Sequence, residues 1–188
     1  MKENMNTLEQ ALIFAVESHS GQTRKKTEIP FITHPIEVGN TIREMTQKDG
    51  KVDIEAVAAG FLHDVVEDTD VSIEEINEKF GDEVSQLVSC QTEDKSKTWQ
   101  ERKDHTMEFL TKNTSKRIEI CVLADKLANI RSLEKEYREV GENIWSKFNA
   151  GKEKQFWYYN TIAKKMKYVR DTKEFHEYKS LLEKTFGE

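Results

Sequence analysis

Apolar residues recur every three or four positions along most of the chain, the spacing of one face of an α-helix. Over residues 7–19 this face carries Leu8, Ala11, Leu12, Ala15, Val16 and His19. Similar stretches follow near residues 53–67, 115–136 and 143–170, and no segment alternates convincingly between apolar and polar residues. The pattern therefore predicts an all-α protein, a compact multi-helix bundle.

Capping signals divide this pattern into separate helices. Thr7 with Gln10, Ser72 with Glu75 and Thr98 with Glu101 have the spacing of a capping box. Pro35 suits a first helical position. The predicted helices cover residues 7–19, a segment from about 35, then 53–67, 72–81, 82–91, 98–112, 115–136, 143–170 and 172–185, with a break expected near Gly151. Because no linker-like stretch interrupts them, the sequence predicts a single domain over residues 1–188.

The length and composition are those of a protein that needs no disulfide. A chain of 188 residues buries roughly 70% of its unfolded surface, enough for a hydrophobic core. Cys90 and Cys121 fall inside apolar runs, so we expect reduced core thiols and a cytoplasmic location. No apolar run approaches the ~18 residues of a membrane span, and the first ten residues lack the apolar core of a signal peptide.

The net charge of −6 argues against binding to nucleic acid, which depends on Lys and Arg neutralising phosphates. A small phosphorylated substrate is compatible with this charge, because a bound metal and one local basic cluster can attract it. The run Arg24–Lys26 is such a cluster. The sequence assigns no oligomeric state.

The stretch FLHDVVEDT, residues 61–69, concentrates groups that bind metals or transfer protons. On a continuous helix, with about 100° per residue, His63 and Glu67 would lie one turn apart, as would Asp64 and Asp68. Burying this two-by-two patch would cost several kcal/mol per unpaired charge, a cost that a divalent cation relieves. The competing interpretation is a solvated helix end.

Two further stretches favour the metal. His34 directly precedes the helix-starting Pro35, and Asp125 lies within an apolar run with Asn129 one turn further on. A carboxylate in that setting needs a partner. Together His34, His63, Asp64 and Asp125 supply two imidazoles and two carboxylates, which suit a borderline first-row metal such as Mn²⁺ better than Ca²⁺ or Mg²⁺.

The order of these motifs resembles the HD superfamily of metal-dependent phosphohydrolases. The strings GQTRKK, IPFITHPIEV, FLHDVVEDT, FGDEVSQLV and LADKLANIRSL follow one another as in the hydrolase domain of RelA/SpoT homologues. The similarity covers about residues 6–170, and the compact length is similar to that of stand-alone small alarmone hydrolases, a group with a metazoan member. The two long strings FLHDVVEDT and LADKLANIRSL are specific, whereas a bare His-Asp pair is weak.

The resemblance implies a role for each matching position. His34, His63, Asp64 and Asp125 match the ligands of one divalent metal, usually Mn²⁺. Glu67 and Asp68 match the acidic pair that handles the attacking water. The implied substrate contacts are Arg24, Lys25, Asn129, Lys152 and Phe156. The implied reaction removes the 3′-pyrophosphate from guanosine tetra- or pentaphosphate, giving GDP or GTP and pyrophosphate.

Some positions depart from the family pattern and leave other functions open. Ala128 replaces a bulkier His or Tyr, and Lys152 and Phe156 stand where Arg and Tyr are usual. These changes bear on the choice of nucleotide, so an HD phosphohydrolase acting on NADPH or a nucleoside monophosphate is an alternative. A non-catalytic nucleotide sensor is a second alternative, although a pure binder needs no pair like Glu67–Asp68.

Overall fold

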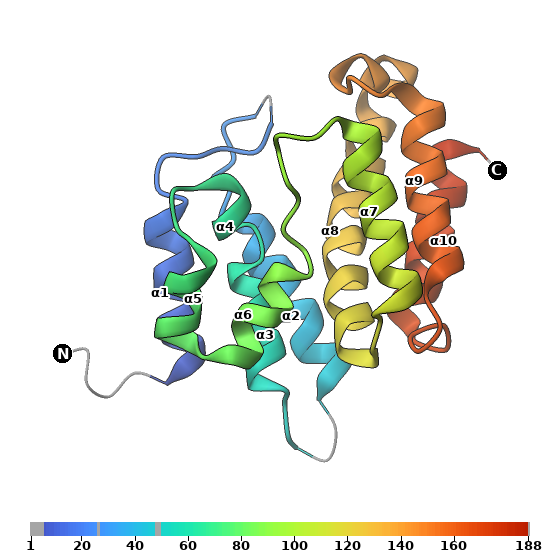
Figure 1. Ribbon diagram of the computed structural model, residues 1–188. Helices are drawn as coiled ribbons and strands as arrows, with labels where there is room; N and C mark the ends of the chain where they lie inside the picture. The colour runs from blue at the N-terminus through green and yellow to red at the C-terminus, as the bar shows by residue number, and fades with distance from the viewer. Residues whose placement is uncertain (1–5, 26, 48–49, 188) are drawn as a thin grey trace. The chain divides into compact units, whose positions relative to one another are not determined.

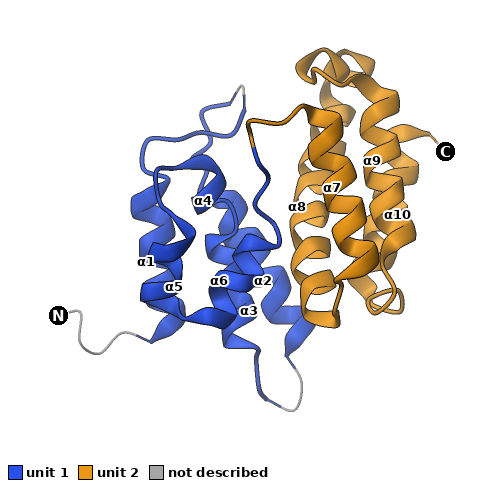
Figure 2. Ribbon diagram, viewed as in Figure 1, with its two compact units in different colours: residues 1–94 blue, residues 95–188 orange. Residues whose placement is uncertain are grey.

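The computed structural model describes residues 6–25, 27–47 and 50–187, so Lys26 of the predicted basic cluster lies outside the described residues. Within these ranges the chain is helical, without a β-strand; one isolated bridge joins Thr23 and Pro30 (Figure 1). The predicted all-α class is confirmed. The chain forms two compact units, residues 1–94 and 95–188 (Figure 2).

The first unit surrounds one short buried helix. Its helices are α1 Thr7–Ser18, α2 Thr33–Thr46, α3 Ile54–Leu62, α4 Val65–Asp68, α5 Ile73–Phe80 and α6 Asp82–Ser89. Every α3 residue from Ala56 to Leu62 is buried. Since α3 packs against α1, α2 and α6, it is the centre of this unit's core.

The second unit is organised around the long helix α8. Its elements are α7 Trp99–Lys112, α8 Lys116–Val140, the 3₁₀ helix η1 Gly141–Lys147, α9 Gly151–Lys165 and α10 Lys173–Phe186. The helix α8 packs against α10 and η1, and α9 packs against α7 and α10. Aromatic rings fill the end of this core, where Trp145 stacks on Phe186 with ring centroids 5.0 Å apart.

Helix starts follow the predicted signals with small shifts. The capping box of α7, Thr98 with Glu101, is confirmed. That of α1 pairs Asn6 with Glu9, one residue before the predicted pair. The helix α2 begins at Thr33, so Pro35 is its third residue. The predicted helix 143–170 is in fact η1 followed by α9, separated near Gly151, whose φ of 67° suits glycine.

The predicted continuous helix over residues 53–67 is wrong, and the break falls at the chemical motif. The helix α3 ends at Leu62, His63 and Asp64 form a turn, and α4 begins at Val65. The imidazole Nδ1 of His63 donates to the carbonyl of Gly60 at 2.8 Å. In a continuous helix that carbonyl accepts the backbone N–H of residue 64, so the side chain competes with the helix. The two-by-two patch on one helix face does not exist.

Candidate active site

Close contact between α2 and α3 brings two of the predicted metal ligands together. A Cβ on Gly39 would lie 2.3 Å from the ring of Phe61, and one on Gly60 would lie 3.0 Å from the Cα of Gly39. Only glycine allows the helices this approach. His34, in the first turn of α2, and His63, at the end of α3, therefore meet in the core of the first unit.

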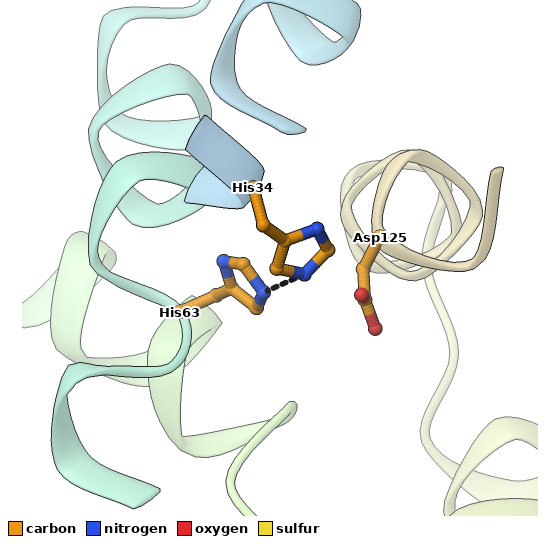
Figure 3. A group of neighbouring side chains, drawn as sticks. All are labelled: His34, His63 and Asp125. Atoms are coloured by element: carbon orange, nitrogen blue, oxygen red, sulfur yellow. Dashed lines mark hydrogen bonds between the residues drawn. The ribbon is translucent and has the colours of Figure 1, made fainter. Parts of the chain in front are cut away.

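The two histidines meet through their ligating atoms (Figure 3), and Asp64 lies within reach of both. The Nε2 atoms of His34 and His63 are 3.2 Å apart. The Oδ2 atom of Asp64 lies 3.1 Å from Nε2 of His63 and 3.6 Å from Nε2 of His34. Both imidazoles are buried, with 4% of His34 and 2% of His63 exposed.

These distances and the histidine tautomer fit a divalent cation. Ligand atoms held at roughly 2.0–2.2 Å from one ion, in tetrahedral or octahedral arrangement, lie about 2.8–3.6 Å apart. The three observed separations fall in that range. Because the carbonyl of Gly60 can only accept, Nδ1 of His63 carries the proton and Nε2 presents its lone pair. The donor set present in the first unit is thus suited to a metal.

Asp125 lies in the buried stretch of α8, in the second unit, and is also labelled in Figure 3. Its two oxygens accept from Nζ of Lys126 and from Nδ2 of Asn129, each at 2.6 Å. The prediction that this carboxylate has partners is confirmed. Burial is the largest single influence on Lys126 and lowers its pKa, but the Asp125 carboxylate together with Tyr158 and Tyr159 outweighs burial and holds that pKa well above its ordinary value.

The acidic pair Glu67–Asp68 lies on α4, a helix of one turn. The carboxylate of Glu67 accepts the backbone N–H of Glu93 at 3.1 Å. Burial is the main cause that raises the pKa of Glu67; the carboxylates of Glu93, Asp64 and Asp68 add to it, and the N–H bond from Glu93 opposes it. A carboxyl whose pKa is raised toward neutrality is better suited to proton exchange with water.

The predicted substrate-binding loop joins α1 to α2. It is closed by the bridge between Thr23 and Pro30 and by a hydrogen bond of 2.8 Å from the Arg24 N–H to the carbonyl of Ile29. The guanidinium of Arg24 lies 5.9 Å from the ring centroid of Phe31, and Lys25 is exposed. The loop therefore carries the cationic side chains of Arg24 and Lys25 next to hydrogen-bonded backbone.

The remaining predicted substrate contacts lie in the second unit, where each has a partner. Asn129 donates to Asp125, as described above. Nζ of Lys152 donates to Oε1 of Glu142 at 2.8 Å. The ring of Phe156 packs against Phe186, with centroids 5.4 Å apart. Their binding of a nucleotide stays a prediction.

Several residues that shape the site carried no chemical signal in the sequence. Gly39 and Gly60 set the approach of α2 to α3, and Gln22 hydrogen-bonds to the backbone of Asp68. A glycine in an apolar helical run hints at close packing. No spacing rule connects residue 22 to residue 68, so only the folded structure reveals that contact.

The family model described as HD domain matches residues 11–155. The chain belongs to the HD-domain family. This confirms the predicted membership, and the matched range includes both histidines, Asp64, the acidic pair and Asp125. Among the described residues, no helix is long and apolar enough to cross a membrane.

Several relatives with named activities are similar to this chain. The guanosine-3′,5′-bis(diphosphate) 3′-pyrophosphohydrolase MESH1 of Xenopus tropicalis is 39% identical over 127 residues, covering 67% of this chain and 69% of that protein. A probable enzyme of the same name from Synechocystis is 38% identical over 129 residues, covering 66% of this chain. This chain spans only 16% of the Synechocystis protein, and likewise 16% of a putative rice chloroplastic GTP diphosphokinase, RSH1.

Solved structures agree with this placement. The protein lmo0812 of Listeria monocytogenes is 35% identical with a TM-score of 0.71, covering 82% of this chain and 99% of that one. A metazoan ortholog of SpoT, described as hydrolysing ppGpp and acting in starvation responses, is 27% identical. Its TM-score is 0.76, and 96% of each chain is covered. The predicted similarity to small alarmone hydrolases is confirmed.

Proposed function

We propose that this protein hydrolyses guanosine 3′,5′-bis(diphosphate), or the corresponding pentaphosphate, to GDP or GTP and pyrophosphate. The observation that carries the proposal is the convergence of His34, His63 and Asp64 in an HD-family chain, with Glu67 and Asp68 on the helix that directly follows Asp64. Its similarity to small pyrophosphohydrolases of that name supports the choice of substrate.

The proposed metal ligands are His34, His63, Asp64 and Asp125, and the proposed ion is one Mn²⁺. Two imidazoles with two carboxylates favour a borderline first-row ion over Ca²⁺ or Mg²⁺. When bound, such an ion lowers the pKa of a coordinated water and polarises a phosphoryl oxygen. For Asp125 to serve as a ligand, the Lys126 ammonium must share or release Oδ2, which it now contacts.

Each of the remaining predicted side chains has a proposed role in the reaction. Glu67, with Asp68 beside it, accepts the proton of the attacking water. The water oxygen forms a bond to the phosphorus attached at the 3′-oxygen, the bond between that phosphorus and the 3′-oxygen breaks, and the 3′-oxygen takes up a proton. Arg24 and Lys25 neutralise the charge on the phosphates. Asn129, Lys152 and Phe156 are the proposed contacts to the nucleoside.

The test is pyrophosphate release from guanosine tetraphosphate by the full chain, with Mn²⁺ and after chelation. We expect metal-dependent release of GDP and pyrophosphate in equal amounts. Glu67→Gln should reduce turnover by at least about 100-fold and leave Mn²⁺ binding intact. His105→Asn, at an exposed position on α7, is the matched control.

A parallel assay with NADPH decides between nucleotides. Phosphate release from NADPH without release from guanosine tetraphosphate would replace the proposed substrate and keep the metal-dependent chemistry. Binding of both nucleotides without turnover of either would favour the sensor interpretation. Turnover that survives both chelation and Glu67→Gln would contradict the proposed roles of the metal and the acidic pair.

A further inference from the structure

Gln22 connects three segments that carry site residues. Its backbone N–H donates to the carbonyl of His19 at 3.0 Å, and its carbonyl accepts the N–H of Phe31 at 2.9 Å. Its side chain contacts Nδ1 of His19 at 2.9 Å and the carbonyl of Asp68 at 3.0 Å. One residue thus joins the end of α1, the loop of Arg24 and Lys25, and the end of α4.

The hydrogen bonds define the orientation of both side chains. The carbonyl of Asp68 can only accept, so it faces the Nε2 amide group of Gln22. Oε1 of Gln22 must then face His19, whose Nδ1 is the donor. His19 is 3% exposed, and its Nε2 has no hydrogen-bond partner within the described part of the chain. Its ring lies 4.8 Å from that of Phe31, which in turn neighbours the ring of His34 at 6.0 Å.

The contact with Asp68 matters because α4 is only one turn long. It spans only Val65–Asp68, and a single turn leaves its last carbonyls without helical partners. Gln22 supplies a donor to the carbonyl of Asp68 from one side. The N–H of Glu93 binds the carboxylate of Glu67 from another. These two contacts orient the short helix that presents the acidic pair.

We propose that Gln22 and His19 are positioning residues for the Glu67–Asp68 pair: His19 orients the Gln22 amide, and Gln22 holds the backbone of α4. This inference rests on the proposed hydrolytic function, which assigns the pair to the attacking water. Because both residues act through the backbone of α4, their loss should lower the rate of the chemical step and spare substrate and metal binding.

The experiment compares four variants of the full chain. Gln22→Met removes both amide contacts. Gln22→Glu keeps an acceptor for His19 but places a carboxylate oxygen, which cannot donate, against the carbonyl of Asp68. Both should lower kcat by about 10–100-fold, the cost of a misplacement of about 1 Å, with KM and the Mn²⁺ dissociation constant within about threefold of wild type. His19→Asn, whose amide can replace the Nδ1 donor, should retain more kcat than His19→Leu.

Asn77→Leu is the matched control, because it removes two side-chain amide bonds, to Asp82 and Ser85, elsewhere in the same unit. Its kcat should equal that of wild type. Wild-type kcat in both Gln22 variants, or a change confined to KM, would overturn the proposal. So would equal losses in His19→Asn and His19→Leu.

A readout without substrate separates this inference from the proposed function. Nitrogen-15 NMR of the histidine rings should show His19 protonated at Nδ1 in the wild type. In Gln22→Met, which lacks the acceptor for that proton, the Nδ1-protonated tautomer should no longer predominate. The opposite tautomer in the wild type would refute the network even in an active enzyme. Absence of turnover in the wild type, with the expected tautomer, would instead refute the proposed function alone.

Discussion

At the scale of single residues, the site contains groups whose protonation states are set by burial and by neighbours. Nδ1 of His63 is held as a donor by the carbonyl of Gly60, which leaves Nε2 available to a metal. The pKa of Glu67 is raised, chiefly because the carboxyl is partly buried. The tautomer of His63 suits metal binding, and the raised pKa of Glu67 suits proton transfer. Keeping the ionised Glu67 carboxylate partly buried also lowers the stability of the folded protein.

Glu67→Gln should stabilise the metal-free protein at neutral pH. Because the pKa of Glu67 is higher in the folded state, the folded state holds this proton more tightly than the unfolded chain does. The associated stability is complete below the ordinary carboxyl pKa and is lost as pH rises through the raised value. The gain from Gln is therefore about 1 kcal/mol or less near pH 7, allowing for solvent screening, and vanishes near pH 4.

Urea unfolding of both proteins at the two pH values, without metal, measures this difference. Glu78→Gln, at an exposed position on α5, serves as the control and should change nothing at either pH. A Glu67→Gln protein that is less stable than wild type at neutral pH would show that the Glu93 contact outweighs the effect of burial.

At the scale of elements, the approach of α2 to α3 determines whether the two histidines meet. Gly60→Ala should lower the free energy of unfolding by about 1–3 kcal/mol and weaken Mn²⁺ binding. The new Cβ would lie 2.6 Å from Cδ1 of Ile42 and 3.0 Å from the Cα of Gly39, so the helices must separate. Alanine's greater helix propensity, about 1 kcal/mol, only partly offsets this cost.

Chemical unfolding and Mn²⁺ titration of the variant test that separation. Ile42→Val in the same background removes the Cδ1 atom and should recover part of the loss, giving a non-additive double-mutant cycle. Strict additivity of the two changes would mean that the contact with Ile42 is not the source of the effect.

The second unit depends on a buried carboxylate. Glu119 on α8 is fully buried and accepts the backbone N–H groups of Lys167 and Tyr168 at 2.7–2.9 Å. Glu119→Gln should destabilise the protein by about 2–4 kcal/mol, because an amide nitrogen cannot accept these hydrogen bonds. Glu108→Gln removes an exposed pair with Lys112 and should leave the stability almost unchanged, because solvent screens such pairs. Thermal unfolding compares the two; equal effects would contradict a special role for Glu119.

At the scale of the whole molecule, the proposed metal should raise stability by mass action. Mn²⁺ at about 100 times its dissociation constant should add about 2.7 kcal/mol to the free energy of unfolding. His34→Asn should abolish most of this gain, whereas His105→Asn, at an exposed position, should retain it. Thermal unfolding across a Mn²⁺ series provides the measurement. An identical Mn²⁺ response in both variants would exclude His34 as a ligand.

Much of the molecule followed from local signals in the sequence. Helical spacing predicted the all-α class, the box Thr98–Glu101 marked the start of α7, and the long motifs identified the family. The helical spacing placed His19 on the apolar face of the first helix, and it is buried at the end of α1. These features depend on residues within about one helical turn of each other or on runs of neighbouring residues, so the local sequence is enough to predict them.

The break at His63–Asp64, the glycine contact of α2 with α3 and the link from Gln22 to Asp68 were decided by the tertiary structure. At His63 and Gln22 the partner is a backbone carbonyl, a group that every residue has, so the residue types do not reveal which carbonyl is bound. At Gly39 and Gly60 the partner is a residue on another helix, and the sequence does not say which helices pack together. The sequence by itself determined which side chains could bind a metal or move a proton. Only the packing of the chain determined which of them face one another and through which atoms.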